Sequence, residues 1–413
     1  MNNNLSTKLN TVENNISVMK TNWGLDEDSS IETLTETAQL KLQDKTVNVF
    51  DNGEPQIITI DEEYNGLNSV TVNVAPASNA LFKILEWGGG GPSSVEILEG
   101  VIGIPSCFKS SWNTSTSSPV GFFSSIKKII LPSTMKAIKE KGLENAAYLS
   151  EINLEHIEEI HNEAFRYCRS LRNIPLKEGL NSKNFSRNPN KLQYATFLQC
   201  QNLETINIPS NIIGIGASCF SQCANLQLTE LPEGIVEIGS GYLPNGGTSE
   251  SGATFSGCSK ITISKLPDSL ISMVGRSNFN NCVGLTKFNL NNVPQLHGYD
   301  FQGCSNLVSI TMPKLIKNNA SSQSYSPFDQ CSKLKAAWFG NTLTNLPLYT
   351  FKGCSSLIKI YIDLPRSTVS TFAGYSKGFT YDVNNQNKVI CNDDENFLTQ
   401  EQFEAIDWST YTE

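Results

Sequence analysis

Hydrophobic positions repeat along the middle of the chain in a fixed pattern, F-x-x-C-x-x-[LI], which occurs eight times between Phe165 and Leu357. Successive cysteines of this pattern are 32, 23, 35, 24, 22, 27 and 23 residues apart. A base unit of 22 to 24 residues that recurs with insertions is typical of a solenoid, in which each repeat packs on its neighbours. The pattern therefore predicts one long stacked core.

The segment after each motif reads x-x-I-x-[IL]-P, as in residues 203–209. Side chains alternate between the two faces of a strand, so we expect a short strand here that ends at the proline. A second short apolar element, such as residues 212–216, precedes the next phenylalanine. One coil is thus predicted to contain a strand, a turn, a second extended piece and a corner that carries Phe and Cys.

The unit IPSNIIGIGASCFSQCANLQ, from Ile208 to Gln227, resembles the BspA-like leucine-rich repeat. The resemblance covers about residues 120–363, with degenerate units before Phe165. It implies a right-handed solenoid that recognises proteins or glycans and has no catalytic machinery of its own. We therefore expect a β-rich leucine-rich-repeat solenoid of short parallel strands over residues 96–363, preceded by an N-terminal helix and a small β module.

Apolar residues near the N-terminus are spaced 4-3-4-3, the spacing of an a/d heptad seam. They are Leu5, Leu9, Val12, Ile16 and Met19. The seam fits either a coiled coil or an amphipathic helix that packs on its own protein, and an isolated helix this short is marginal in water. We therefore predict that residues 1–45 form a helical attachment or oligomerisation segment.

Residues 46–78 alternate in the manner of strands and contain turn signals, which predicts a small β module. Within it, YNGLNSVTVNV (Tyr64 to Val74) resembles a module of phage tail and appendage proteins and of some bacterial surface proteins. The run Gly88 to Pro92 predicts a Gly-rich linker over residues 79–95.

The last part of the chain, residues 364–413, departs from the repeat. Thr399 and Gln402 have the spacing of a capping box for a short helix that carries Phe403, Ile406 and Trp408. A solenoid exposes an apolar edge at its end, so we expect this part to cap the last coil.

The composition of the chain argues against several classes of function. The formal net charge of -9 and the pI near 5.1 argue against binding to nucleic acid or an anionic membrane surface, because phosphate binding needs clustered Lys and Arg. No run of apolar residues is long enough for a membrane span, and the first residues do not resemble a secretory signal.

The spacing of the cysteines favours a structural role in the core over a role in metal binding or catalysis. Zinc ligands come in close pairs, and Cys219 with Cys223 is the only near pair in the chain. Cysteines at one position of successive coils are expected to form a column of buried free thiols. Asp393, Asp394 and Glu395 lack the spacing of a calcium loop. We expect no metal, no cofactor and no catalytic residue, since the sequence has none of the common catalytic motifs.

A recognition surface is predicted on the outward side of the strands. Positions two and four after the Leu of each motif should point outward. The candidate residues in the later coils are Lys287, Asn289, Ser309, Thr311, Trp338, Lys359 and Tyr361. Trp338 and Tyr361 would lie on adjacent rungs and stack on a sugar or anchor a peptide. The alternative is that the C-terminal cap covers them.

These features together favour a structural protein of a phage particle, a tail or head fibre or appendage. Its N-terminal segment would bind other virion proteins, and its solenoid would bind a host surface protein or glycan. The alternative is a cellular adhesin or protein-interaction scaffold with BspA-like repeats. The expected location is accordingly the virion, or else the cell surface. A homo-oligomer fits both hypotheses.

Overall fold

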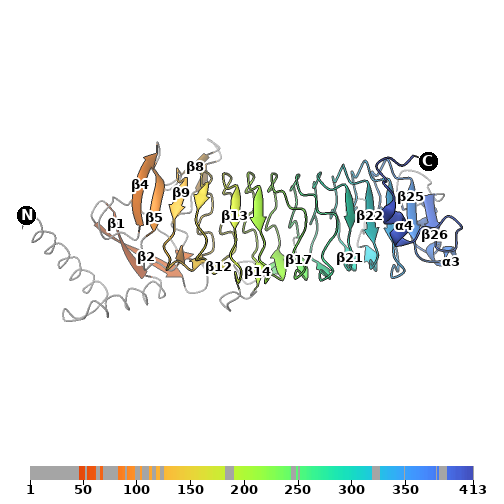
Figure 1. Cartoon of the computed structure of the whole chain (residues 1–413), viewed down its shortest axis with the longest axis horizontal. Coiled ribbons are helices and arrows are strands. Elements are labelled where there is room, and N and C mark those ends of the chain that lie inside the picture. Colours follow the sequence, from red (N-terminus) through yellow and green to blue (C-terminus); the bar gives the residue numbers. More distant parts are fainter. Residues whose placement is uncertain are drawn as a thin grey trace, which may run out of the picture.

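The computed structural model shows a long stack of coils (Figure 1). It describes residues 46–412 apart from 52–53, 62–65, 68–81, 89–90, 98–102, 105–110, 114–117, 121–124, 182–189, 243–247, 250–251, 319–325, 348, 378 and 381–387. The predicted helical segment with Leu5, Leu9, Val12, Ile16 and Met19 therefore lies outside the described residues. The hydrophobic core is continuous from Val95 to Cys391.

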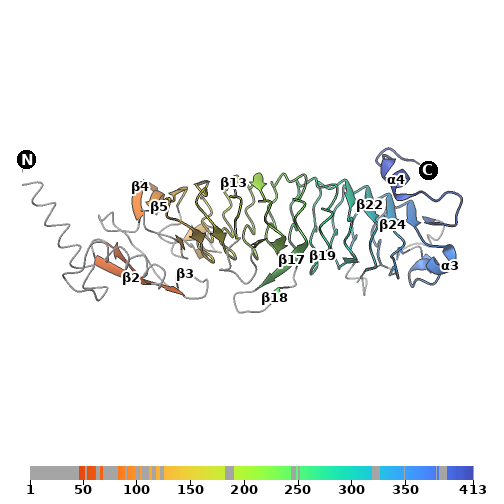
Figure 2. The same ribbon diagram turned by 60° about the horizontal axis from the view of Figure 1, so that its bottom comes forward.

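Two strand faces run along the solenoid, the first along the top and the second along the bottom of Figure 2. The strands of the first face are parallel wherever they pair with one another. They are β5 (Gly91–Ile97), β9 (Lys128–Ile130), β11 (Glu151–Ile152), β13 (Asn173–Pro175), β15 (Thr205–Asn207), β20 (Lys287–Asn289), β22 (Ser309–Met312), β24 (Ala336–Phe339), β25 (Lys359–Ile362) and β26 (Val389–Cys391).

The second face consists of mostly shorter strands, at most one in a coil. They are β6 (Gly103–Ile104), β10 (Ala137–Ile138), β12 (Glu159–Ile160), β14 (Lys191–Leu192), β16 (Gly214–Gly216), β17 (Glu237–Tyr242), β19 (Ser272–Met273), β21 (Gln295–Leu296) and β23 (Lys317–Asn318). Strand β17 continues into a hairpin with β18 (Thr248–Ser249). The β-rich leucine-rich-repeat solenoid predicted from the repeat is confirmed.

The third side of each coil is the corner that carries the Phe-Cys motif. The eight phenylalanine rings form one continuous stack, with centroids of neighbouring rings 5.3 to 5.6 Å apart. Each motif cysteine is buried and free, and its thiol donates a hydrogen bond to a carbonyl of the preceding coil at 3.0 to 3.2 Å. The eight thiols therefore form the predicted column and also join each coil to the one before it.

The degenerate unit before Phe165 is a coil of the same kind. Leu143 takes the position of the phenylalanine, and its carbonyl accepts the hydrogen bond from the Cys168 thiol. Both residues are buried in the main core. The ladder thus extends beyond the regular motif because the position needs an apolar side chain more than it needs an aromatic one.

Asparagine side chains add a second link between coils. The amide of Asn207 accepts a hydrogen bond from the Leu176 N–H and donates one to the Leu176 carbonyl, both at 2.8 Å. Asn153 makes the same pair of bonds with Leu131, and Asn181 makes it with Ile160. These uncharged side chains replace backbone pairing where the chain turns.

The N-terminal part of the described chain differs from the sequence prediction. The stretch expected as a linker over residues 79–95 contains β4 (Phe82–Gly88), which pairs antiparallel with β5. Strand β5 in turn pairs with β9 and begins the parallel ladder. Gly88 and Gly91 therefore lie at the tight end of a hairpin, where the strand ladder pairs their backbones.

Short antiparallel strands complete the N-terminal part. In the predicted β module, β1 (Thr46–Asp51) and β3 (Gly66–Leu67) flank β2 (Glu54–Asp61). Residues 69–74, which also alternate in the manner of a strand, lie outside the described residues. Strand β7 (Ser111–Asn113) pairs with β8 (Ser118–Val120).

At the C-terminal end the ladder runs past the boundary expected at residue 363, because β26 pairs with β25. Between these strands lie α3 (Arg366–Val369) and a 3-10 turn, η3 (Tyr375–Lys377). The Arg366 guanidinium donates to the Val389 carbonyl, to the Asp394 carboxylate and to the Tyr375 hydroxyl. These bonds hold the last strand in place.

The final helix, α4 (Gln400–Ala405), begins with the predicted capping box at Thr399 and Gln402. It does not close the end of the stack. It lies across the outer side of the first strand face (Figure 2), where the Asn289 amide donates to Glu404 Oε1 and the Lys335 ammonium donates to the Ser409 carbonyl. The C-terminal segment is therefore a cover for one face.

We predict that Phe279→Ala lowers the free energy of unfolding by about 3–5 kcal/mol, because it opens a cavity in a fully packed core. The Phe279 ring is fully buried and contacts the rings of Phe255, Phe288 and Phe301. Urea unfolding followed by circular dichroism measures the change. Tyr148→Ala is the matched control, since 49% of that residue is exposed. Equal midpoints for the two variants would contradict the role of the stack.

Candidate interaction surface

Two of the predicted recognition residues, Trp338 and Tyr361, lie on the outer side of the first strand face. Trp338 and Tyr361 belong to an aromatic cluster separate from the solenoid core, together with Phe403 and Trp408 of the C-terminal segment. Only 5% of Trp338 and 4% of Tyr361 are exposed. Apolar rings that point outward need a cover, and the C-terminal segment provides it. The alternative left open by the sequence, that the C-terminal part covers the two rings, is the one that the structure shows.

The other predicted residues lie beneath the same segment or at its border. Ser309 and Thr311 are buried. The Lys287 ammonium donates to the Glu404 carbonyl, and the Asn289 amide donates to the Glu404 side chain. Lys359 is half-buried. The structure thus brings these residues together as the seat of the C-terminal segment, and the surface they form is not open to a partner.

The second strand face carries an exposed apolar row, with one residue from each of five successive coils. The row consists of Ile213, Val236, Ile271, Pro294 and Ile316. The exposed fractions of the three isoleucines are 38%, 60% and 44%, and the other two residues are half-exposed. Each row residue comes directly before a strand of the second face, so the solenoid repeat aligns the five side chains.

The backbone ladder along this row is broken at one point. The Val236 N–H donates to the Ile213 carbonyl at 2.8 Å, the Ile271 N–H donates to the Val236 carbonyl at 3.1 Å, and the Ile316 N–H donates to the Pro294 carbonyl at 2.8 Å. Proline has no N–H, so Pro294 cannot donate to the Ile271 carbonyl. Among the described residues, no strand pairing joins β19 to β21.

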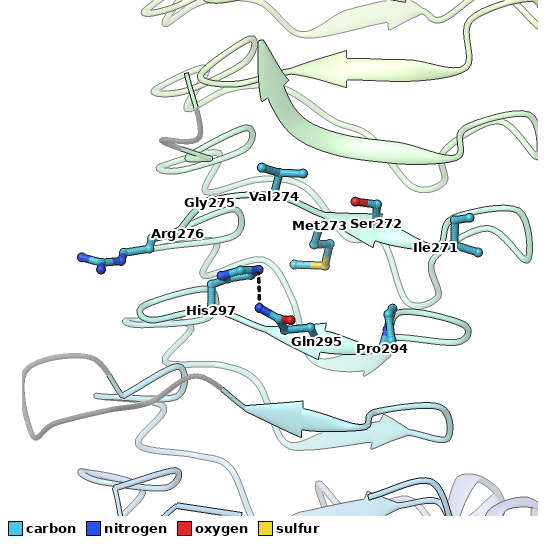
Figure 3. Close-up of a pocket in the computed structure, with 9 residues that line it drawn as sticks. All are labelled: Ile271, Ser272, Met273, Val274, Gly275, Arg276, Pro294, Gln295 and His297. Carbon is cyan, nitrogen blue, oxygen red and sulfur yellow. Dashed lines mark hydrogen bonds between the residues drawn. The ribbon is translucent and has the colours of Figure 1, made fainter. Parts of the chain in front are cut away.

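A groove of about 630 Å³ lies at this break. It is lined by residues 271–276 on one side and by Pro294, Gln295 and His297 on the other. Figure 3 shows the Met273 side chain between the two strands, and a hydrogen bond of 3.2 Å between the Gln295 amide and His297 Nε2. Such a groove, with apolar residues at one end and polar side chains at the other, can hold a side chain of a protein partner.

The buried carboxyl of Asp300 links the two walls of the groove through hydrogen bonds. Asp300 accepts hydrogen bonds from the His297 N–H at 2.7 Å, and from the N–H and the side-chain amide of Asn278 at 3.1 and 3.2 Å. The Asn278 amide also donates to the Val274 carbonyl in the opposite wall. Burial raises the pKa of Asp300 to about 7, although these donors oppose the shift.

Within the described ranges, two other clusters of polar residues have their charges paired internally. Cys391, Asp393 and Asp394 are close enough to hold a metal ion, but the Arg366 guanidinium pairs with Asp394 and the Arg366 N–H donates to Asp393. A cation at that position would face the positive charge of the arginine. The buried Glu144 and Glu163 carboxylates are both paired with Arg166. In the part of the chain that the structure describes, no helix is long and apolar enough to cross a membrane.

The apolar row was not found from the sequence, although a signal for it exists. Each row residue follows an inward apolar residue, as in Ile212-Ile213 and Leu270-Ile271, and the pair resembles ordinary core hydrophobicity. The bond that Pro294 cannot make becomes visible only when successive coils are placed side by side.

The family model described as BspA type leucine rich repeat region matches the chain in six copies, over residues 121–187, 178–251, 242–358 and 274–392. These matches together cover more than half of the chain.

Solved structures of low sequence identity are similar to parts of the chain. A leucine rich cell surface protein from Faecalibacterium prausnitzii is 20% identical, with a TM-score of 0.37, and the match covers 68% of this chain and 82% of that protein. A leucine-rich repeat protein from Bacteroides ovatus is 19% identical, with a TM-score of 0.37 and coverage of 74% and 97%. Among curated proteins no match was found.

We predict that the pKa of Asp300 makes the stability of the protein depend on pH. The folded-state value of about 7 lies above the value of about 4 for an unfolded chain, so the folded protein retains a proton that the unfolded chain releases. The stabilising contribution is therefore complete below about pH 4 and is lost as the pH rises to about 7, by at most about 1.4 kcal/mol per pH unit.

Urea unfolding of the wild-type protein and of Asp300→Asn between pH 5 and pH 8 tests this. The free energy of unfolding of the wild type, measured relative to that of Asp300→Asn, should fall as the pH rises, because only the wild type loses the contribution. Asp268→Asn is the control, since Asp268 is exposed and its pKa is lowered by the hydrogen bond from Lys265. A difference that stays constant over this range would count against the buried carboxyl.

Proposed function

This chain belongs to the BspA-type leucine-rich repeat family, and from that premise we propose that it is an adhesive interaction scaffold that binds partner proteins through its second strand face. Proteins of this family are typically non-enzymatic scaffolds that mediate protein–protein interactions. The observation that carries the proposal is the apolar row Ile213, Val236, Ile271, Pro294 and Ile316 beside the groove.

The row has the properties of an interface centre. Burying one isoleucine side chain fully is worth about 1.5–3 kcal/mol, so three exposed isoleucines in line represent a free energy that a partner would recover. Contiguous apolar surface of this kind on a soluble protein marks an interaction site more often than isolated apolar residues do. The groove adds polar groups that give specificity, since Gln295 and His297 lie beside the apolar end.

The two strand faces differ in what they offer a partner. The first face is covered over β22, β24 and β25 by the chain's own C-terminal segment. The second face presents the row over five coils. Binding through the second face therefore needs no displacement of a packed segment, and this favours it over the aromatic residues that the sequence suggested.

Adhesion at a cell surface is the form of this function that we propose. The role in a phage particle rests on features that include the predicted N-terminal helix and the resemblance of Tyr64 to Val74, and most of those residues lie outside the described part of the chain. Location in a virion and binding to other virion proteins therefore stay predictions.

The double variant Ile271→Glu/Ile316→Glu is predicted to reduce binding to target cells at least tenfold, because two charges would have to be buried without partners in the interface. The probe is the fluorescently labelled full-length chain, added to intact bacterial and epithelial cells with and without proteinase treatment. A protein partner predicts binding that proteinase removes.

Tyr148→Glu is the matched control, because it places the same charge at an exposed apolar residue away from the row. Circular dichroism should show the same spectrum for all variants. Wild-type binding by the double variant would contradict the proposed surface, and binding that survives proteinase but not periodate would indicate a glycan as the partner.

A further inference from the structure

We propose that the apolar row binds residues 5–19 of a second copy of this chain, as an α-helix laid along the axis of the solenoid. The inference rests on the proposed function of the row as a protein-binding surface, and it names one occupant. It joins two apolar features: the exposed row, and the 4-3-4-3 series that the sequence predicts as a helix, Leu5, Leu9, Val12, Ile16 and Met19.

The lengths of the two features agree. The five row residues directly precede strands of successive coils, and neighbouring strands of a sheet are about 4.8 Å apart, so the four intervals of the row span about 19 Å. An α-helix rises 1.5 Å per residue, so the fourteen residues from Leu5 to Met19 span about 21 Å. Five apolar side chains of the helix would thus meet five apolar positions of the row.

The spacing also distinguishes a helix from a strand. Along a helix the apolar residues of the 4-3-4-3 series follow one another at about 5.3 Å on average, which is close to the spacing of about 4.8 Å between neighbouring strands, whereas side chains on one face of a strand are about 6.7 Å apart. An extended segment along the row would drift by more than one Å at each coil. A helix drifts by only about 0.5 Å at each coil, or about 2 Å over the whole row.

The polar positions of the segment suit the groove. Between its apolar residues it carries mostly Asn, Ser and Thr, with one positive and one negative charge at Lys8 and Glu13. Hydroxyl and amide side chains can donate hydrogen bonds to the backbone carbonyls of the broken ladder beside Pro294, and no uncompensated charge has to be buried.

The resulting contact joins two different surfaces, the segment of one copy and the row of the next. Such a heterologous interface does not use up both surfaces in a dimer, so further copies can add until a ring closes or a filament forms. This arrangement would present several solenoids together and raise their avidity for a target.

Two full-length variants that complement each other test the proposal. The row variant, Ile271→Glu/Ile316→Glu, keeps an intact segment, and the segment variant, Leu9→Glu/Val12→Glu, keeps an intact row. The molar mass of each protein is measured by light scattering after size exclusion, over a hundredfold range of concentration.

The wild type is expected to increase in mass with concentration beyond a dimer, and each variant alone is expected to stay a monomer. An equimolar mixture of the two variants should give a dimer and nothing larger, because only one of the possible interfaces can form. Tyr148→Glu should assemble like the wild type.

Three results would overturn the inference: a wild type that stays monomeric, a row variant that still assembles, or a mixture that gives no dimer. An assembling row variant beside a monomeric segment variant would show that the N-terminal segments pair with one another. If the wild type is monomeric and the row variant still loses binding to cells, the proposed function stands and only its occupant is wrong.

Discussion

The contact between one coil and the next determines everything else in this protein. A coil of about 23 residues loses about 1–2 kcal/mol of backbone entropy per residue on folding, which its few inward side chains cannot offset alone. The offset comes from the neighbouring coil, through the stacked phenylalanine rings, the cysteine thiols that donate to the preceding carbonyls, and the strand ladders. Because each coil depends on its neighbours, the same contacts recur from coil to coil along the solenoid.

This recurrence decides how much of the fold the sequence could predict. The Phe-Cys motif marks the corner of every coil, so the solenoid and the thiol column follow from a pattern of local residues. The residue before each motif cysteine has a positive φ, as at Gln199 and Asn281. This residue is one of the two variable positions of F-x-x-C, so the motif does not predict its backbone conformation. The asparagine links cannot be predicted from local sequence either, because Asn207 bonds to a residue 31 positions earlier.

The predictions that failed depend on contacts between distant segments. Residues 79–95 look flexible because of their glycines, yet pairing with β9 makes β5 the first strand of the ladder. The alternation of its strand predicts that Trp338 points outward, but the exposure of this residue depends on Leu398, whose carbonyl accepts a hydrogen bond from the indole N–H at 2.9 Å. Local alternation gives the direction of a side chain, and only the tertiary structure tells what covers it.

The groove of the second face lies where one backbone donor is missing, at Pro294. Hydrogen exchange followed by NMR or mass spectrometry at single-residue resolution measures its consequence directly. We expect the Gln295 amide to exchange rapidly, and the Ile316 amide, which donates to the Pro294 carbonyl one coil later, to be strongly protected. Equal protection of the two amides would mean that the ladder is continuous between β19 and β21, and the groove and its role as a binding site would then have no structural basis.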